Sequence, residues 1–135
     1  MLITRKVEFS ASHVCRNPQL SGEENFDLFG AAANPYGHGH NYVLEVTVEG
    51  TPDPVTGMVL DLKVLKDILN REVVEIYDHR FLNEEVSPFD RVIPTVENIA
   101  MDIWRRLQAQ VTGLHSVRVY ETPDLYVEYT GGDAA

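Results

Sequence analysis

The chain has 135 residues and a formal net charge of −10, and this length is typical of one domain, residues 1–135, with its own hydrophobic core. The acidity argues against a nucleic-acid partner and against binding to an anionic membrane surface. The lone Cys15 excludes an internal disulfide, and no apolar run is long enough to cross a membrane. Charged residues close to the N-terminus argue against a signal peptide. We therefore expect a cytoplasmic protein.

Two stretches in the first part of the chain alternate between apolar and polar residues. Residues 2–13 place His13 on their apolar side, and residues 38–49 place His38 and His40 on theirs. Alternation of this kind is typical of half-buried antiparallel strands. The intervening residues are rich in Asn, Pro, Gly and Ala, so we expect a long loop over 14–37, and loops of this length in compact domains are usually functional.

A helical pattern follows the turn residues at 51–57. Asp61 can cap this first helix, whose apolar residues recur at helical spacing. They are Leu62, Leu65, Ile68, Leu69, Val73 and Ile76. Residues 78–94 contain two prolines and show no period, so we expect irregular structure there.

The last part of the chain contains a second helix and two strands. The second helix is predicted to begin near Thr95 and to end at Gly113. Residues 117–121 and 125–129 alternate as strands, with a Pro-Asp turn between them. The order ββααββ indicates an α+β fold in which two helices cover one face of an antiparallel sheet.

Three histidines lie on the apolar side of the first two predicted strands. Alternation directs His38 and His40 the same way, and His13 ends the neighbouring strand. Neutral imidazole is the usual nitrogen ligand of zinc, and three histidine ligands leave one tetrahedral position open, which is typical of a catalytic site. The pattern therefore predicts a catalytic zinc ion. The alternative is that two of these histidines are structural side chains near a turn.

Asp78-His79 and Glu121 have two interpretations each, whereas Thr95 and Glu97 have one. In Asp78-His79 the carboxylate can orient the imidazole for acid–base catalysis, or the pair is part of a surface loop. Glu121 shares the apolar face of its strand, so it needs either a salt bridge or a ligand with a planar N–H pair, such as a pterin or guanine. Thr95 and Glu97 fit a helix cap and a favourable helix-dipole charge.

Several motifs occur together in the order found in one enzyme family. They are Phe9-Ser10-Ala11-Ser12-His13, Leu20-Ser21-Gly22-Glu23-Glu24-Asn25, Phe29-Gly30, Asn34-Pro35-Tyr36-Gly37-His38-Gly39-His40-Asn41-Tyr42, Asp53-Pro54-Val55-Thr56-Gly57-Met58-Val59, Asp78-His79, Thr95-Val96-Glu97-Asn98 and Val119-Tyr120-Glu121-Thr122. On these residues the chain resembles the 6-pyruvoyltetrahydropterin synthase family, which includes the bacterial 6-carboxytetrahydropterin synthases. The resemblance covers nearly the whole chain.

The resemblance implies a T-fold whose subunits form trimeric barrels. Two barrels stack as a homohexamer, a dimer of trimers, with active sites between subunits. His13, His38 and His40 are implied to hold the zinc ion, while Asp78 and His79 belong to the proton-transfer apparatus.

The resemblance also implies a pterin substrate, 7,8-dihydroneopterin triphosphate. Glu121 is implied to anchor the pterin ring, with Thr95 and Glu97 near it, and zinc to polarise the side-chain hydroxyls during proton abstraction and triphosphate loss. The product is 6-pyruvoyltetrahydropterin, for tetrahydrobiopterin biosynthesis, or 6-carboxytetrahydropterin, for queuosine biosynthesis. The long loop and residues 53–59 resemble the pyruvoyl branch more closely.

One residue departs from the family pattern. The family's catalytic cysteine follows Phe-Gly closely, and alignment through Asn34 places Ala32 at that position. Alanine cannot transfer a proton, so Ala32 indicates either a paralogue with altered chemistry or an introduced substitution. Cys15 is either a small packing residue or a surrogate near the zinc ion. The chain is thus predicted to be a synthase, or alternatively a pterin-binding paralogue without turnover. A structural T-fold subunit without metal is a third interpretation, which the intact histidine triad disfavours.

Overall fold

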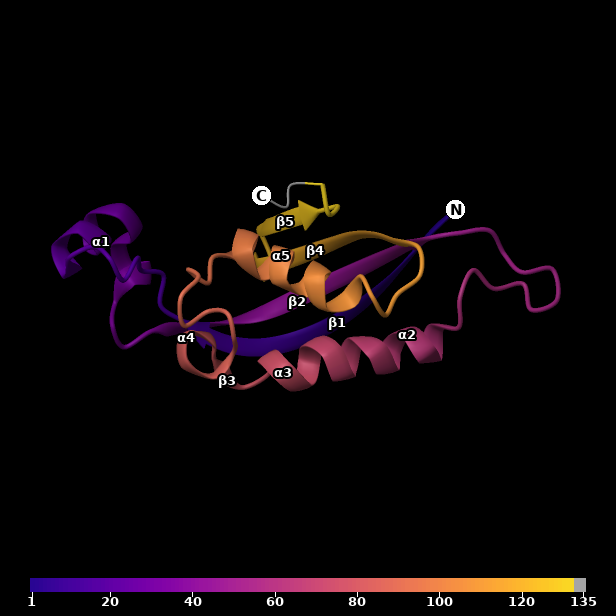
Figure 1. The fold of residues 1–135 in the computed structure, drawn as a ribbon, viewed down its shortest axis with the longest axis horizontal. Helices are drawn as coiled ribbons and strands as arrows, with labels where there is room; N and C mark the ends of the chain where they lie inside the picture. Colours follow the sequence, from indigo (N-terminus) through magenta and orange to yellow (C-terminus); the bar gives the residue numbers. More distant parts are fainter. Residues whose placement is uncertain (133–135) are drawn as a thin grey trace.

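The computed structural model describes residues 1–132 and contains a five-stranded sheet in the order β3-β1-β2-β4-β5 (Figure 1). The strands are β1 (Leu2–His13), β2 (His38–Glu49), β3 (Arg80–Phe81), β4 (Leu114–Thr122) and β5 (Leu125–Tyr129). β1, β2, β4 and β5 pair antiparallel, and β3 pairs parallel to β1. The predicted α+β architecture with an antiparallel sheet is therefore confirmed.

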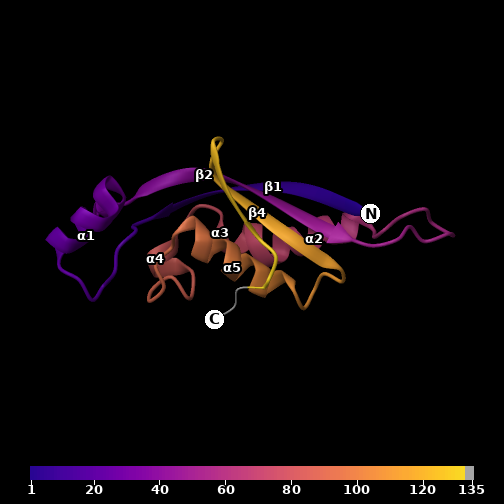
Figure 2. The same cartoon turned by 90° about the horizontal axis from the view of Figure 1, so that it is seen from above.

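Helices cover one face of this sheet. The helices are α1 (Gly22–Phe29), α2 (Leu62–Leu69), α3 (Glu75–Tyr77), α4 (Leu82–Glu85) and α5 (Val96–Leu107), and a π-helical turn, Asn70–Val74, joins α2 to α3. Figure 2 shows α2 to α5 on the same side of the sheet, whereas α1 projects beyond its end. Within residues 1–132, no helix has both the length and the apolar character needed to cross a membrane.

The hydrophobic core lies between the sheet and these helices. It is built from the apolar positions that the alternation and helical spacing predict. Fully or nearly fully buried members are Phe9, Tyr42, Leu44, Val46, Val117 and Val119 from the sheet, and Leu65, Leu69, Ile99, Ile103 and Leu107 from the helices. The histidines predicted to bind metal continue the same apolar side of β1 and β2, at the end of the core.

The prediction of an unbroken loop over residues 14–37 was wrong, because α1 and a 3₁₀ turn, Gly30–Ala33, lie within it. Ser21 and Glu24 form a capping box at the start of α1. The side-chain amide of Asn25 donates hydrogen bonds to the carbonyl oxygens of Asn17, Leu20 and Ser21, which links α1 to the residues that precede it. Asn25 is the one buried residue of α1, so no apolar stripe marked the helix. The capping box was the signal that could have found it.

Residues 78–94 also differ from the irregular segment that was predicted. They contain β3 and α4, and β3 is too short for alternation to reveal it, since it forms only by pairing two residues with β1. The second predicted helix, α5, ends at Leu107 and not at Gly113. Gly113 instead has a φ of +78° at the entry to β4, where a Cβ atom would lie 2.5 Å from the carbonyl oxygen of Glu49.

Candidate active site

The pairing of β1 with β2 brings the three predicted metal ligands together. His13 lies directly opposite His38, and His40 lies opposite Ala11, two residues further along the ladder. Gly37 precedes β2 with a φ of +76°, and a Cβ atom there would lie 3.3 Å from the carbonyl oxygen of His13. A glycine at this position therefore allows the chain to enter β2 close to the end of β1.

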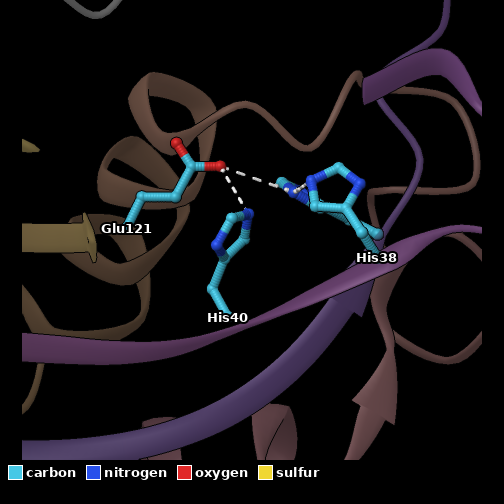
Figure 3. A group of neighbouring side chains, drawn as sticks. His38, His40 and Glu121 are labelled. Carbon is cyan, nitrogen blue, oxygen red and sulfur yellow. Dashed lines mark hydrogen bonds and ion pairs between the residues drawn. The ribbon is translucent and has the colours of Figure 1, made fainter. Parts of the chain in front are cut away.

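The imidazoles converge with one carboxylate on a single point (Figure 3). The Nε2 atoms of His13 and His38 are 3.0 Å apart. Oε1 of Glu121 lies 3.1 Å from Nε2 of His40 and 3.5 Å from Nε2 of His13. Ligand atoms of all four residues lie within 4.8 Å of one another, so one ion can contact them all.

The protonation of these side chains suits a metal ion. Nδ1 of the buried His13 lies 2.7 Å from the carbonyl oxygen of Pro94, which can only accept, so Nδ1 donates and Nε2 presents a lone pair. Burial lowers the pKa of His13 to about 4, so the ring is neutral at pH 7. Burial also lowers the pKa of His40. The buried Nε2 of His40 makes no well-aligned hydrogen bond within residues 1–132, and its near neighbour there is Oε1 of Glu121 at 3.1 Å. A cation among these nitrogens would satisfy them all, and the residues therefore fit a divalent metal ion.

A β-bulge directs Glu121 toward the histidines. Tyr120 and Thr122 pair with successive residues of β5, which leaves Glu121 without a partner in that strand. Its side chain continues the buried face of Val117 and Val119, as the alternation predicted. Figure 3 shows that the second carboxylate oxygen points away from the histidines. The carboxylate can therefore approach a metal ion with one oxygen and accept a ligand N–H with the other.

Cys15 packs against the opposite edge of the His13 ring. Its Sγ lies 3.9 Å from Nδ1 of His13, and the hydroxyl of Tyr42 is 3.4 Å from the same atom. Burial raises the pKa of Cys15 to about 11, so the thiol is neutral at pH 7. The backbone N–H of Cys15 donates to the carbonyl of Ala32 at 2.9 Å, which places Ala32 beside the site. This placement of the thiol supports a packing role for Cys15.

The start of α5 borders the site. The Oγ1 atom of Thr95 accepts a hydrogen bond from the N–H of Asn98 at 3.3 Å, so the predicted cap is confirmed, and Glu97 is exposed in the first turn. The bond between His13 and Pro94 holds this end of α5 against the histidines. Sequence reasoning missed Pro94, because no side-chain pattern reveals which backbone carbonyl will orient a ligand.

Asp78 and His79 form a dyad with defined geometry. Oδ2 of Asp78 lies 2.9 Å from Nδ1 of His79, and Oδ1 accepts the N–H of Ser10 at 2.8 Å. The bond from Ser10, and then the one from His79, lowers the pKa of Asp78, so the carboxylate is ionised and leaves Nε2 of His79 available for proton transfer. His79 has a φ of +60°, which is strained for a residue other than glycine, and its side chain is 82% exposed.

This dyad and the histidine cluster lie on opposite faces of the sheet. His79 borders a hollow of about 520 Å³, whose lining includes His40 together with the polar residues Ser10, Ser12 and Asn41. Along β1 and β2 these polar residues alternate with His13 and His40, so their side chains face the other way. One chain therefore contains both constellations that the sequence predicted but does not bring them to one point.

Several known proteins are similar to this chain in sequence and in fold. The family model described as 6-pyruvoyl tetrahydropterin synthase matches residues 2–132. The 6-pyruvoyl tetrahydrobiopterin synthase of Homo sapiens is 45% identical over 131 residues, which cover 96% of this chain and 90% of that protein. The 6-carboxy-5,6,7,8-tetrahydropterin synthase of Rickettsia bellii is 29% identical over 145 residues, and the match covers 93% of this chain and 96% of that protein.

A solved structure gives the same result. The 6-pyruvoyl tetrahydropterin synthase of Caenorhabditis elegans superimposes with a TM-score of 0.93 at 36% identity, and the match covers 98% of this chain and 96% of that one. The sheet and helices thus form the T-fold that the resemblance implied. Agreement of sequence and structure over almost the full length leaves one assignment, and the chain belongs to the 6-pyruvoyl tetrahydropterin synthase family.

Proposed function

We propose that this protein is a zinc-dependent pterin synthase acting on 7,8-dihydroneopterin triphosphate. The observation that carries the proposal is the convergence of His13, His38 and His40 with the carboxylate of Glu121, with the ligand atoms of all four residues within 4.8 Å of one another. Three histidine nitrogens with a position left for substrate favour zinc among the common metal ions. The free buried thiol of Cys15 fits the reducing cytoplasm, where we place the enzyme.

Each polar residue then has a role in the chemistry. Zinc, when bound by the three histidines, would supply Lewis acidity toward the hydroxyls of the substrate side chain. Glu121 accepts N–H groups of the pterin ring, and Thr95 and Glu97 flank that ring at the start of α5. His79 exchanges protons through Nε2, while Asp78 holds the imidazole in the required tautomer.

The product is the finer part of this proposal. The 45% identical relative is named a pyruvoyl synthase and the 29% identical one a carboxy synthase, which favours 6-pyruvoyltetrahydropterin over 6-carboxytetrahydropterin. Incubation of the zinc-loaded protein with 7,8-dihydroneopterin triphosphate, followed by mass spectrometry, distinguishes the two products. Ala32 supports the alternative function, a pterin-binding paralogue without turnover. Binding of the substrate with no product over long incubation would establish that alternative.

Glu121→Gln is expected to weaken pterin binding about ten- to a hundredfold, because glutamine keeps the shape but loses the charge-assisted hydrogen bond. Calorimetry with dihydroneopterin measures the affinity. Glu45→Gln is a matched control, since the side chain of Glu45 is 16% exposed against 18% for Glu121 and pairs with Lys6 on the opposite face. Equal affinity in the parent and in Glu121→Gln would show that Glu121 has only a structural role.

The edges of the sheet support a homohexamer built from two trimeric barrels. β1 pairs with β3 at Ala11 and Ser12 alone, so the rest of its outer edge has no strand partner within residues 1–132. β5 forms the other edge, and closure of such edges into a barrel removes exposed backbone groups. We expect light scattering to report the mass of six chains at micromolar concentration, and a monomer would contradict the proposed assembly.

The opposite placement of dyad and histidine cluster supports an active site shared between subunits. Co-expressed His40→Ala and His79→Ala chains are expected to regain up to about a quarter of parent turnover, because random mixing pairs an intact cluster with an intact dyad at that frequency. Each variant alone should be inactive. A co-purified mixture that forms mixed hexamers yet shows no turnover would contradict a shared site.

A further inference from the structure

Arg80 is an unpaired cation beside the catalytic dyad. Acidic residues outnumber Lys and Arg by 21 to 11 in this chain, and Arg91, which lines a different hollow, is paired with Asp90. Within residues 1–132 the Arg80 guanidinium makes no ion pair, although Arg80 borders the hollow next to His79. The protein is acidic overall, so an unpaired arginine at a polar hollow gives a local positive charge that attracts anions.

The hollow offers further hydrogen-bond donors. Ser10 Oγ donates to Oδ1 of Asn41 at 2.7 Å, which orients the amide and leaves its amino group for a ligand. Ser12 contributes a hydroxyl, and Nδ1 of His79 is held by Asp78, so Nε2 remains available. The one carboxylate in the lining, Glu85, has Oε2 engaged by the N–H of Phe81 at 2.6 Å.

We propose that this hollow binds the triphosphate chain of the substrate, with Arg80 as the principal contact. The inference rests on the proposed function. A guanidinium presents paired N–H groups that match phosphate oxygens, and hydroxyl and amide donors complete their hydrogen bonds. The dyad and the hollow share one face of the sheet, so a substrate that reaches His79 from a neighbouring subunit's metal site brings its charged chain to Arg80.

Inorganic tripolyphosphate tests the inference without the pterin. Calorimetry on the zinc-loaded protein should show that Arg80→Gln lowers its affinity about ten- to a hundredfold, because one charge-assisted pair is lost. Arg91→Gln, the matched control with the same change of charge, should bind as the parent does. Chelation of zinc by tripolyphosphate would affect all three proteins equally. Asn41→Asp, which puts a carboxylate into the hollow, is a second variant expected to weaken binding.

Dihydroneopterin, which lacks phosphate, separates the two proposals. It should bind the parent and Arg80→Gln equally. Equal tripolyphosphate affinity in the parent and Arg80→Gln, or no tripolyphosphate binding by the parent, overturns the inference. If the parent nonetheless binds dihydroneopterin and converts the triphosphate substrate, the proposed function stands. If dihydroneopterin does not bind either, both proposals fail.

Discussion

Ala32→Cys is expected to raise the turnover of 7,8-dihydroneopterin triphosphate by about 10²–10⁴-fold, the usual contribution of a general acid–base group. The resemblance implies that a cysteine at this position takes part in proton transfer, and alanine cannot. The carbonyl of Ala32 accepts the N–H of Cys15, whose side chain contacts the His13 ring. The backbone of Ala32 is therefore joined to the segment that follows His13. Steady-state rates of parent and variant measure the gain.

Cys15→Ala is the control for this gain. Its Sγ faces Nδ1 of His13, whereas Nε2 faces the other ligands, so we expect little change in turnover. Suppose instead that Ala32→Cys has no effect and Cys15→Ala abolishes turnover. Cys15 would then carry the missing function, and the assignment of Ala32 to the cysteine position would be wrong. Absence of turnover in every variant, despite bound zinc and pterin, would favour the binding paralogue.

His40→Ala is expected to lower zinc affinity by more than about 100-fold, because even loss of an outer-shell partner costs about 10–100-fold. The parent should hold about one zinc ion per chain, since a tetrahedral site uses three protein ligands and one open position. Elemental analysis after dialysis against a zinc buffer measures both values, and turnover should fall with the metal content.

His115→Ala is the matched control, since His115 lies on β4 near Glu49 and outside the cluster. Neither variant should unfold, because the core between sheet and helices does not depend on the ion. Circular dichroism checks this point. A parent without zinc after metal-replete expression, or His40→Ala with unchanged zinc content, would contradict the assignment of the ligands.

The alternating pattern along β1 and β2 by itself determined much of the fold. The period of two assigns each side chain to a face, so it predicted the core residues and placed His13, His38 and His40 on one side. The helical spacing after Thr95 likewise located α5. These signals are local, and they are strong because each element buries a continuous apolar face.

Short elements leave no periodic pattern in the sequence. β3 consists of two residues and exists because β1 offers an edge, and α1 buries Asn25 where a longer helix would bury an apolar stripe. The approach of Glu121 to His40 depends on a bulge between β4 and β5. None of these features leaves a period in the chain, because β3 and the bulge depend on strand pairing and α1 depends on one buried amide and its capping box.

The tertiary structure alone decided how the functional groups are distributed in space. Both His40 and the dyad residue His79 could be singled out from the sequence, but the strand pleat and the pairing of β3 with β1 put them on opposite faces. The same pairing places Arg80 beside His79 at a hollow that no linear motif encodes. Residue types can suggest chemistry, whereas the face on which each residue acts follows from strand pairing across long sequence separations.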